Sequence, residues 1–145
     1  MTVRDLHHVS VVVDDLESAT AFFAALGLEV EGEAPVDGEA VDRLNAIDGV
    51  RIRIVMMRTP DGHGRLELTR FDHPPAVGSE DPATPNRRGL RSVMFGVDDL
   101  DATLAGLGPH GAELVGEVVQ YEQAYRLAYV RGPAGIIVSL AEALG

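Results

Sequence analysis

The stretch HVSVVVDDLESATAFFAALGLEV, from His8 to Val30, returns in a second version as SVMFGVDDLDATLAGLGPHGAEL, from Ser92 to Leu114. The two stretches align without a gap. Both contain the tetrapeptide Val-Asp-Asp-Leu, which begins at Val13 in the first copy. Internal repetition of this kind indicates a fold built from two copies of one structural unit.

Each copy begins with a pattern that is typical of a β-strand. Apolar residues alternate with others, so that His8 and Ser10 lie on one face of the predicted strand and Val9 and Val11 lie on the other. The spacing of apolar residues then changes to that of an amphipathic helix, with Leu16, Ala19, Phe23 and Leu26 on one side. A strand followed by a helix is therefore predicted in both copies.

The ends of these helices are predicted from their capping residues. In the first copy Asp14 is the expected N-cap, Glu17 would complete a capping box, and Gly27 would end the helix. The second copy repeats this pattern with Asp98, Asp101 and Gly111. Two independent sets of capping residues at matching positions support the repeat.

Three short strand patterns follow each helix. In the first half they cover residues 28–34, 50–58 and 65–71, and in the second half residues 113–120, 125–131 and 136–140. Residues 38–47 are predicted to form a short helix or a lid. Each half therefore has the order βαβββ, and the fold class is predicted to be α+β.

A proline-rich stretch separates the two halves. Residues 72–88 include Pro74, Pro75, Pro82 and Pro85 and show no periodicity, which indicates a linker between module one at 1–71 and module two at 89–145. Neither half has enough helix to cover its own sheet. We therefore expect one domain, residues 1–145, in which two modules form a curved, cup-shaped mixed sheet with helices on the outside.

Composition excludes several classes of function. The chain has 145 residues and no cysteine, so disulfides, thiolate catalysis and cysteine-type zinc sites are excluded. It has no lysine, which excludes Schiff-base chemistry. A net charge of −11 argues against nucleic acid as a partner. No apolar run is long enough to span a membrane, and a cytoplasmic location is expected.

The pattern resembles the vicinal oxygen chelate superfamily, which includes glyoxalase, methylmalonyl-CoA epimerase, extradiol dioxygenases, and the fosfomycin and bleomycin resistance proteins. The resemblance covers nearly the whole chain. It rests on four motifs: Leu6-His7-His8-Val9 leading to Asp14-Asp15-Leu16, Arg65-Leu66-Glu67-Leu68, Val97-Asp98-Asp99-Leu100, and Gly132-Pro133-Ala134-Gly135. Because this fold hosts unrelated activities, the resemblance predicts fold more strongly than function.

The resemblance implies a divalent metal held by two side chains from each module. In the first module these are His8 and Glu67, which strand alternation directs to the same side. Such a pair suits iron, manganese, nickel, zinc or cobalt. In the second module the corresponding positions hold Ser92 and Ser139, which are poor metal ligands. A complete metal site is therefore in doubt, and the two serines are instead expected to contact substrate.

Further residues are candidates for the same site. Glu67 or Glu122 could move a proton as a catalytic carboxylate, and Tyr129 could contact substrate. Arg53 could hold an anionic group of the substrate, because a guanidinium binds carboxylates through two hydrogen bonds. Structural roles remain open: His8 could be a hydrogen-bonded histidine at a strand start, and Arg53 could form an ion pair with Glu67. The remaining candidates are expected to be solvated: His63, His73 and His110.

Three functions remain open. The first is a metal-assisted enzyme of glyoxalase type, with lyase, isomerase, epimerase or dioxygenase chemistry on an oxygen-bearing metabolite. The second is a metal-free protein that sequesters a small molecule, similar to the bleomycin resistance proteins. The third is an enzyme without metal, in which His8 and Glu67 act as a general acid/base pair. A homodimer is expected by analogy with the superfamily and because edge strands need covering.

Overall fold

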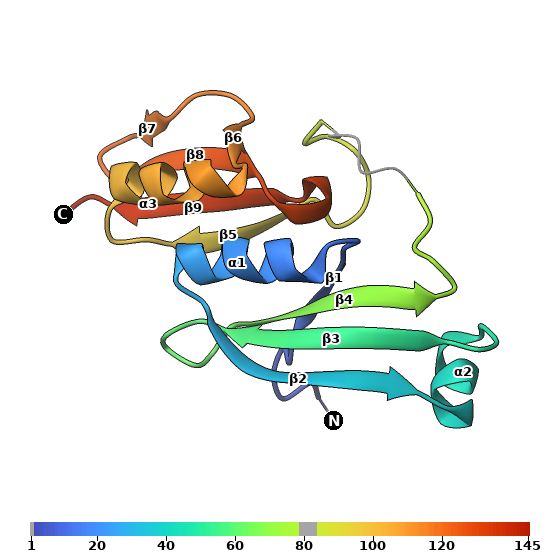
Figure 1. Cartoon of the computed structure of the whole chain (residues 1–145). Helices are drawn as coiled ribbons and strands as arrows, with labels where there is room; N and C mark the ends of the chain where they lie inside the picture. Colours follow the sequence, from blue (N-terminus) through green and yellow to red (C-terminus); the bar gives the residue numbers. More distant parts are fainter. Residues whose placement is uncertain (1, 79–83) are drawn as a thin grey trace. The chain divides into compact units, whose positions relative to one another are not determined.

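The computed structural model describes residues 2–78 and 84–145. The chain divides into two compact units, Met1–Gly78 and Ser79–Gly145. Each unit contains a mixed β-sheet with an α-helix packed on one face, as the ribbons in Figure 1 show. The predicted α+β class is confirmed.

Unit 1 is built on a four-stranded sheet in the order β1-β4-β3-β2. Strand β1 runs parallel to β4, and the other pairs are antiparallel. Its elements, in chain order, are β1 (Val9–Val12), α1 (Leu16–Leu26), β2 (Glu29–Asp37), α2 (Glu39–Asn45), β3 (Arg51–Arg58) and β4 (Arg65–His73). The short helix α2 fills the stretch in which a short helix or lid was predicted, and it lies beyond the end of β2 (Figure 1).

Unit 2 repeats this topology with the strand order β5-β9-β8-β6, and β7 also pairs with β8. Strand β5 is parallel to β9, as β1 is to β4. Its elements are β5 (Ser92–Gly96), α3 (Leu100–Leu107), the 3-10 helix η1 (Gly108–His110), β6 (Glu113–Leu114), β7 (Val119–Tyr121), β8 (Tyr125–Arg131), the 3-10 helix η2 (Pro133–Gly135) and β9 (Ile137–Ala143). Two copies of one unit are therefore confirmed.

One predicted strand is interrupted in unit 2. We expected a continuous strand over residues 113–120, but β6 and β7 are separate pieces. Leu114 pairs with Val130 and Val119 pairs with Leu127, so four residues on one side face two on the other. Residues 115–118 therefore cannot all pair with β8, and the predicted strand is divided into two.

The predicted N-caps are wrong by one residue in both units. Asp15, not Asp14, caps α1, and its side chain accepts a hydrogen bond from the backbone N–H of Ser18. Asp99, not Asp98, caps α3 in the same way. The third helical position is thus not Glu17, and the predicted capping box does not form. Sequence alone could not separate two adjacent aspartates that both suit an N-cap.

Both helices end before glycine in the left-handed region. Gly27 has φ of 119° and receives the end of α1, as predicted. In unit 2 the 3-10 helix η1 extends the helical path after α3, and Gly111 ends it with φ of 86°. Residues other than glycine adopt these angles at a cost, so the two glycines fix where the chain turns into the following strand.

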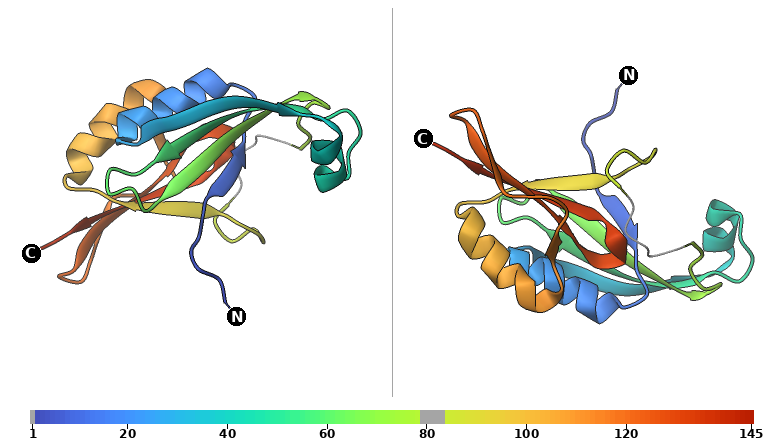
Figure 2. Two further views of the ribbon diagram at one scale, coloured as in Figure 1. Left: turned by 90° about the horizontal axis from the view of Figure 1, so that it is seen from below. Right: turned by 90° about the horizontal axis from the view of Figure 1, so that it is seen from above.

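The core of each unit lies between its helix and one face of its sheet. In unit 1, Phe22 and Phe23 of α1 are buried together with Leu68 of β4. In unit 2, Leu100 and Leu107 of α3 are buried with apolar residues of β8 and β9: Ala128, Val130, Val138 and Leu140. Figure 2 shows α1 and α3 each along one face of the strands of their own unit. We call the opposite face of each sheet its helix-free face.

A β-bulge lies in β2 of unit 1. Val30 pairs with Met57 and Gly32 pairs with Met56, so Glu31 has no partner in β3. The side chain of Glu31 accepts a hydrogen bond from Nε of Arg65 in β4, at 2.8 Å. This bond lowers the pKa of Glu31 below its ordinary value. The bulge therefore connects β2 with β4 across the strand between them.

The predicted linker starts later than expected. Strand β4 continues to His73, two residues into the stretch assigned to the linker at 72–88. Pro82 of that stretch lies outside the described residues. None of the described helices is long and apolar enough to cross a membrane.

Candidate functional site

The structure brings His8 and Glu67 together on the helix-free face of unit 1. His8 precedes β1, and Glu67 lies in β4 directly opposite Ser10. Nε2 of His8 is 3.3 Å from Oε2 of Glu67, and the two side chains are 29% and 19% exposed. Because β1 and β4 are neighbouring parallel strands, the pair is fixed by the sheet itself. The predicted proximity of these two residues agrees with the geometry.

Two hydroxyls hold the second carboxylate oxygen of Glu67. The Oγ1 atom of Thr69 donates to Oε1 at 2.9 Å, and Oγ of Ser10 donates to the same atom at 3.4 Å. Thr69 is only 4% exposed, so its own position is set by packing. One oxygen of Glu67 is thus anchored, and the other is presented to His8.

The imidazole of His8 has a second neighbour, His7. Their Nδ1 atoms are 2.7 Å apart, and the rings meet edge to face with centroids 5.0 Å apart. One ring must donate and the other accept. If Nε2–H of His8 donates to Glu67, then Nδ1 of His8 accepts from His7. This arrangement places an imidazole beside a carboxylate, which is a suitable pair for proton transfer.

Arg65 is a cation close to this pair, but it is engaged elsewhere. It shares the alternation of Glu67 in β4, yet its Nε donates to Glu31. The anion that balances Arg65 is therefore Glu31, and Glu67 keeps hydroxyl and imidazole partners.

Unit 2 carries different side chains at the matching positions. In the parallel pair of β5 and β9, Met94 lies opposite Ser139, as Ser10 lies opposite Glu67. Ser139 therefore occupies the place of Glu67, as the sequence repeat predicted. Ser139 is 1% exposed, whereas Ser92 is exposed. Tyr129 lies directly opposite Ser139 in β8.

The donors that we find do not fit a complete metal site. Unit 1 offers one imidazole and one carboxylate, and unit 2 offers two hydroxyls at the corresponding positions. Catalytic zinc usually has three protein ligands of nitrogen, sulfur or carboxylate type. Within residues 2–78 and 84–145, no group of three or more histidine, aspartate or glutamate side chains is arranged to hold a metal ion. The described residues thus supply half of the ligand set that the resemblance implies.

Arg53 does not lie on the face that carries Glu67. It pairs with Arg70 in β4, whereas Glu67 pairs with Met56, so the two residues point to opposite sides of the sheet. Nε of Arg53 is 3.4 Å from Oδ2 of Asp72. Arg53 also lines a cavity of about 370 Å³ beside the start of α1. The hypothesis of an ion pair between Arg53 and Glu67 is therefore wrong.

Glu122 lies in the turn between β7 and β8. It has a positive φ of 53°, and its carbonyl oxygen accepts a hydrogen bond from the side chain of Gln120. Its side chain is exposed. Tyr125 begins β8 next to this turn, whereas Ser139 lies opposite Tyr129, four residues further along the strand. Within unit 2, Glu122 is thus at the end of the sheet and apart from Ser139.

The three tyrosines of the chain gather on the helix-free face of unit 2. Tyr121 pairs with Tyr125, and Tyr129 follows on the same side of β8. They are 59%, 45% and 41% exposed. Met94 of β5, which lies opposite Ser139 on the other side of β9 from Tyr129, is 54% exposed. Of the three, only Tyr129 was predicted to contact substrate. Residues two apart in a strand lie on the same face, so the spacing of Tyr125 and Tyr129 along β8 could have shown that they belong together.

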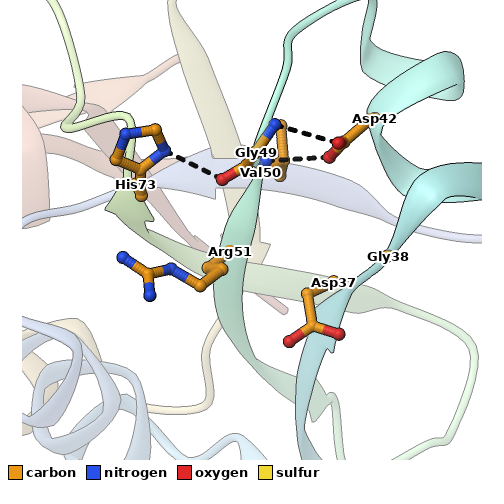
Figure 3. A pocket seen from close by; sticks show the side chains of 7 residues that line it. All are labelled: Asp37, Gly38, Asp42, Gly49, Val50, Arg51 and His73. Atoms are coloured by element: carbon orange, nitrogen blue, oxygen red, sulfur yellow. Dashed lines mark hydrogen bonds between the residues drawn. The ribbon is translucent and has the colours of Figure 1, made fainter.

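A second group of polar side chains surrounds an open cavity of about 490 Å³ in unit 1. Figure 3 shows this cavity between the start of α2, the start of β3 and the end of β4. His73, which we expected to be solvated, directs Nδ1 at the carbonyl oxygen of Gly49 over 2.8 Å. The cavity contains neither His8 nor Glu67.

Comparison with known proteins decides the family. Residues 5–140 match the model of the Glyoxalase/Bleomycin resistance protein/Dioxygenase superfamily. The chain belongs to this superfamily. The match includes both units and the positions of His8, Glu67, Ser92 and Ser139. A general role in binding or converting small molecules follows from membership, and divalent metals are common in the superfamily.

Several known proteins match this chain over nearly their full length. A glyoxalase family protein from Bacillus cereus is 47% identical, with a TM-score of 0.95, over 100% of this chain and 97% of that chain. YaeR, an uncharacterized protein of Escherichia coli K12, is 28% identical over 97% of both. TnmS3, an antibiotic binding protein from Streptomyces sp. CB03234, is 21% identical with a TM-score of 0.65, over 99% of this chain and 98% of that chain. The last comparison shows the fold alone.

Proposed function

We propose that the chain is an enzyme that binds an oxygen-bearing small molecule at the helix-free face of unit 1 and transfers a proton on it through His8 and Glu67. The observation that supports this proposal is the 3.3 Å contact between Nε2 of His8 and Oε2 of Glu67. A carboxylate and an imidazole in direct contact can remove a proton from one atom of a substrate and return it to another. Isomerase, epimerase and lyase reactions can each use such a pair.

The neighbours of Glu67 suit a catalytic base. Thr69 and Ser10 hold Oε1, so that Oε2 is the atom that accepts the proton. The imidazole of His8 would then donate to the oxygen on which negative charge develops. Because both side chains come from one sheet, no large movement is needed to align them.

The metal-assisted form predicted from the family would use the same two side chains. His8 would supply an imidazole nitrogen and Glu67 a carboxylate oxygen, with iron, manganese, nickel, zinc or cobalt as the ion. A bound ion would polarise substrate oxygens as a Lewis acid. Metal analysis of protein purified without chelator tests this form: one equivalent of ion in the wild type, lost in both His8→Ala and Glu67→Ala, would support it, and a metal-free protein with an intact fold would rule it out.

Activity is tested by solvent exchange. Wild-type protein is incubated in deuterium oxide with a panel of 2-oxo and 2-hydroxy acids and aldehydes, and deuterium at carbon is followed by nuclear magnetic resonance. We expect Glu67→Gln to lower kcat/KM for an exchanging compound by about 10²–10⁴-fold, the usual contribution of a general base. Glu29→Gln, a carboxylate of β2 bonded to Arg58, is the matched control and should retain the wild-type rate. Equal rates in Glu67→Gln and the wild type would remove Glu67 from the mechanism.

A second candidate function is sequestration of an aromatic small molecule. Exposed Tyr121, Tyr125 and Tyr129 favour it, because aromatic rings supply large stacking surfaces to a flat ligand. The antibiotic binding protein TnmS3 has the same fold. Thermal stabilisation by a panel of aromatic antibiotics tests this candidate. A ligand recovered unchanged, with a shift that is lost in Tyr129→Ala, would support it, and a flat response across the panel would count against it.

We also propose that the chain forms a homodimer and that residues 1–145 fold as one domain in the cytoplasm. Strands β1 and β2 are the edges of the first sheet, and unpaired edge groups favour association. Sedimentation at several concentrations tests the dimer. A single cooperative unfolding transition, rather than two, tests the single domain.

A further inference from the structure

We infer that unit 1 has a second binding site, for a small zwitterion of the α-amino acid type, in the open cavity at the far end of its sheet. The cavity of about 490 Å³ is lined by Asp37, Gly38, Asp42, Gly49, Val50, Arg51 and His73. A volume of this order is typical of small-molecule sites. Three of the lining residues carry ionisable side chains of different kinds: the carboxylate of Asp37, the guanidinium of Arg51 and the imidazole of His73.

These three side chains form a row across three strands. Asp37 of β2 lies directly opposite Arg51 of β3, and Arg51 lies directly opposite His73 of β4. Side chains at directly opposite positions lie on the same face, with Cβ atoms roughly 5 Å apart. A carboxylate, a guanidinium and an imidazole therefore stand side by side at one end of the sheet.

The two charges of this row are not paired with each other. Among the residues that the structure describes, neither Asp37 nor Arg51 has an ion pair or a side-chain hydrogen bond. Six other arginines of the described residues each pair with a carboxylate. In Figure 3 the Arg51 guanidinium lies on the side of His73, and the Asp37 carboxylate is turned away from it. Donors and acceptors are thus available on both sides of the cavity.

The wall behind the row is held in place by hydrogen bonds. Both carboxylate oxygens of Asp42 accept from the chain, one from N–H of Gly49 and one from N–H of Val50. The carbonyl oxygen of Gly49 in turn accepts from Nδ1 of His73 at 2.8 Å. A neutral His73 that donates through Nδ1 keeps Nε2 as a free acceptor. Asp42 is therefore satisfied by the backbone and does not compete for a ligand cation.

Gly49 itself is required by this wall. Its φ is +72°, and a Cβ at this position would lie 3.4 Å from the imidazole of His73. The backbone thus approaches the ring more closely than a larger residue would comfortably allow. The hydrogen bond from Nδ1 of His73 to the carbonyl oxygen of Gly49 holds the ring beside this backbone.

The charges select the class of ligand. A carboxylate of the ligand would bind the guanidinium of Arg51, which offers two parallel donors. An ammonium group of the same ligand would donate to Asp37, which lies on the other side of Arg51 from His73. An isolated anion would meet Asp37, and an isolated cation would meet Arg51, so each half alone is disfavoured. A molecule that carries both charged groups on one carbon, such as an α-amino acid, satisfies both Arg51 and Asp37.

The site is open, and this limits its affinity. Asp37, Arg51 and His73 are all exposed, so their attraction for a charged ligand is screened by salt. We therefore expect binding that weakens as sodium chloride is raised. None of the three residues belongs to the proposed reaction at His8 and Glu67, so the two proposals stand or fall separately.

The test uses the full chain and nuclear magnetic resonance titration with glycine and the common L-amino acids. We expect saturable shifts of the Gly49 and Val50 amide signals, with acetate and methylammonium binding at least tenfold more weakly than the best amino acid. Arg51→Gln and Asp37→Asn should each weaken binding at least tenfold. The matched control is Arg58→Gln at the other end of β3, whose partner is Glu29, and it should bind as the wild type does.

Three results would overturn the inference. The first is the absence of a saturable shift with any amino acid. The second is acetate binding as tightly as the amino acids, which would make the cavity an anion site only. The third is unchanged binding in both Arg51→Gln and Asp37→Asn when their far-ultraviolet circular dichroism matches that of the wild type.

Discussion

The helix-free faces of the two units have the same backbone and opposite chemistry. In unit 1 the adjacent parallel strands present His8 and Glu67, and Thr69 holds the carboxylate. In unit 2 the corresponding pair of strands presents Ser92 and Ser139 among exposed aromatic side chains. The two copies of the unit therefore keep the same pairing of their strands. One copy carries ionisable side chains on this face, and the other carries hydroxyl and aromatic side chains.

The helix-bearing faces differ as well. In unit 2, Oε1 of Glu142 accepts from the N–H of Leu100 at the start of α3, and Oε2 lies 3.6 Å from Arg126. The matching position in unit 1 is Arg70, which pairs with Asp72 instead. The start of α3 is thus held by Asp99 and by a carboxylate of the sheet, while the start of α1 is capped by Asp15. A glutamate in unit 2 and an arginine in unit 1 can occupy this matching position because it lies at the edge of each core.

The largest loss of stability should come from substitution of the buried leucine that both units have at the same position. Leu68 of β4 and Leu140 of β9 occupy the same position, and both are completely buried. Leu68→Ala and Leu140→Ala should each lower the free energy of unfolding by about 2–5 kcal/mol, through lost burial and the cavity that remains. Urea unfolding measures both. A loss below about 1 kcal/mol in either variant would show that the two cores are not equivalent.

A smaller and unequal effect is expected at the exchanged position. Glu142→Ala leaves the part-buried N–H of Leu100 without its acceptor and should cost about 1–3 kcal/mol. Arg70→Ala removes a side chain that is 44% exposed and should change stability by about 0.5 kcal/mol or less. The same urea experiment decides. Equal losses in the two variants would contradict the different roles assigned to the helix starts.

The two helix ends should respond alike. Gly27→Ala and Gly111→Ala place a Cβ in the left-handed region, at φ of 119° and 86°. Each should lower the stability by about 1–2 kcal/mol, since no other atom lies near enough to add a clash. Gly106→Ala, inside α3 and also without close neighbours, is the control and should be neutral or stabilising. A neutral Gly27→Ala would mean that the turn adjusts.

The smallest expected effect is a difference between the two units in how much stability they lose at low pH. In unit 1 the pKa of Asp15 is lowered by its bonds to Ser18, that of Glu31 by Arg65 and that of Asp61 by Thr59. In the described part of unit 2 only Asp101 is lowered, by Arg126. A lowered pKa in the folded state adds stability that is fully present above the ordinary values of 3.8 for aspartate and 4.5 for glutamate. That stability is lost as the pH falls through the lowered values.

Unit 1 should therefore lose more stability than unit 2 between pH 6 and pH 3. Hydrogen exchange, corrected for the intrinsic rate at each pH, measures local opening in the two units separately. We expect protection to fall first in peptides of unit 1. An equal fall in both units would show that other groups dominate the acid response.

The sequence predicted the repeated architecture well because its signals are local. Alternation in β1 and β4 placed His8 and Glu67 on the same face, and the gap-free repeat placed Ser139 at the position of Glu67. The side of the sheet on which Arg53 lies relative to Glu67 was misjudged because it depends on the register between β3 and β4. Register between distant strands is set by turns and bulges, which no single strand reveals.

The contacts of side chains were harder to predict than their faces. Nothing in the sequence shows that Arg65 chooses Glu31, or that His73 reaches the carbonyl oxygen of Gly49. The adjacent aspartates before each helix were equally suitable as caps, and the path of the chain chose the second. Such choices depend on three-dimensional neighbours that lie far away in the chain.

Because Glu31 has no partner residue in β3, β2 could lose this residue without a change in its pairing. Loss of one residue within a regular strand turns every later side chain to the wrong side of the sheet. At the bulge the neighbours Val30 and Gly32 already face consecutive residues of β3, so removing Glu31 would leave an ordinary ladder. Only the tie to Arg65 would disappear. Natural shortening of this hairpin by one residue is thus most easily accommodated at Glu31, with the rest of the strand keeping its orientation.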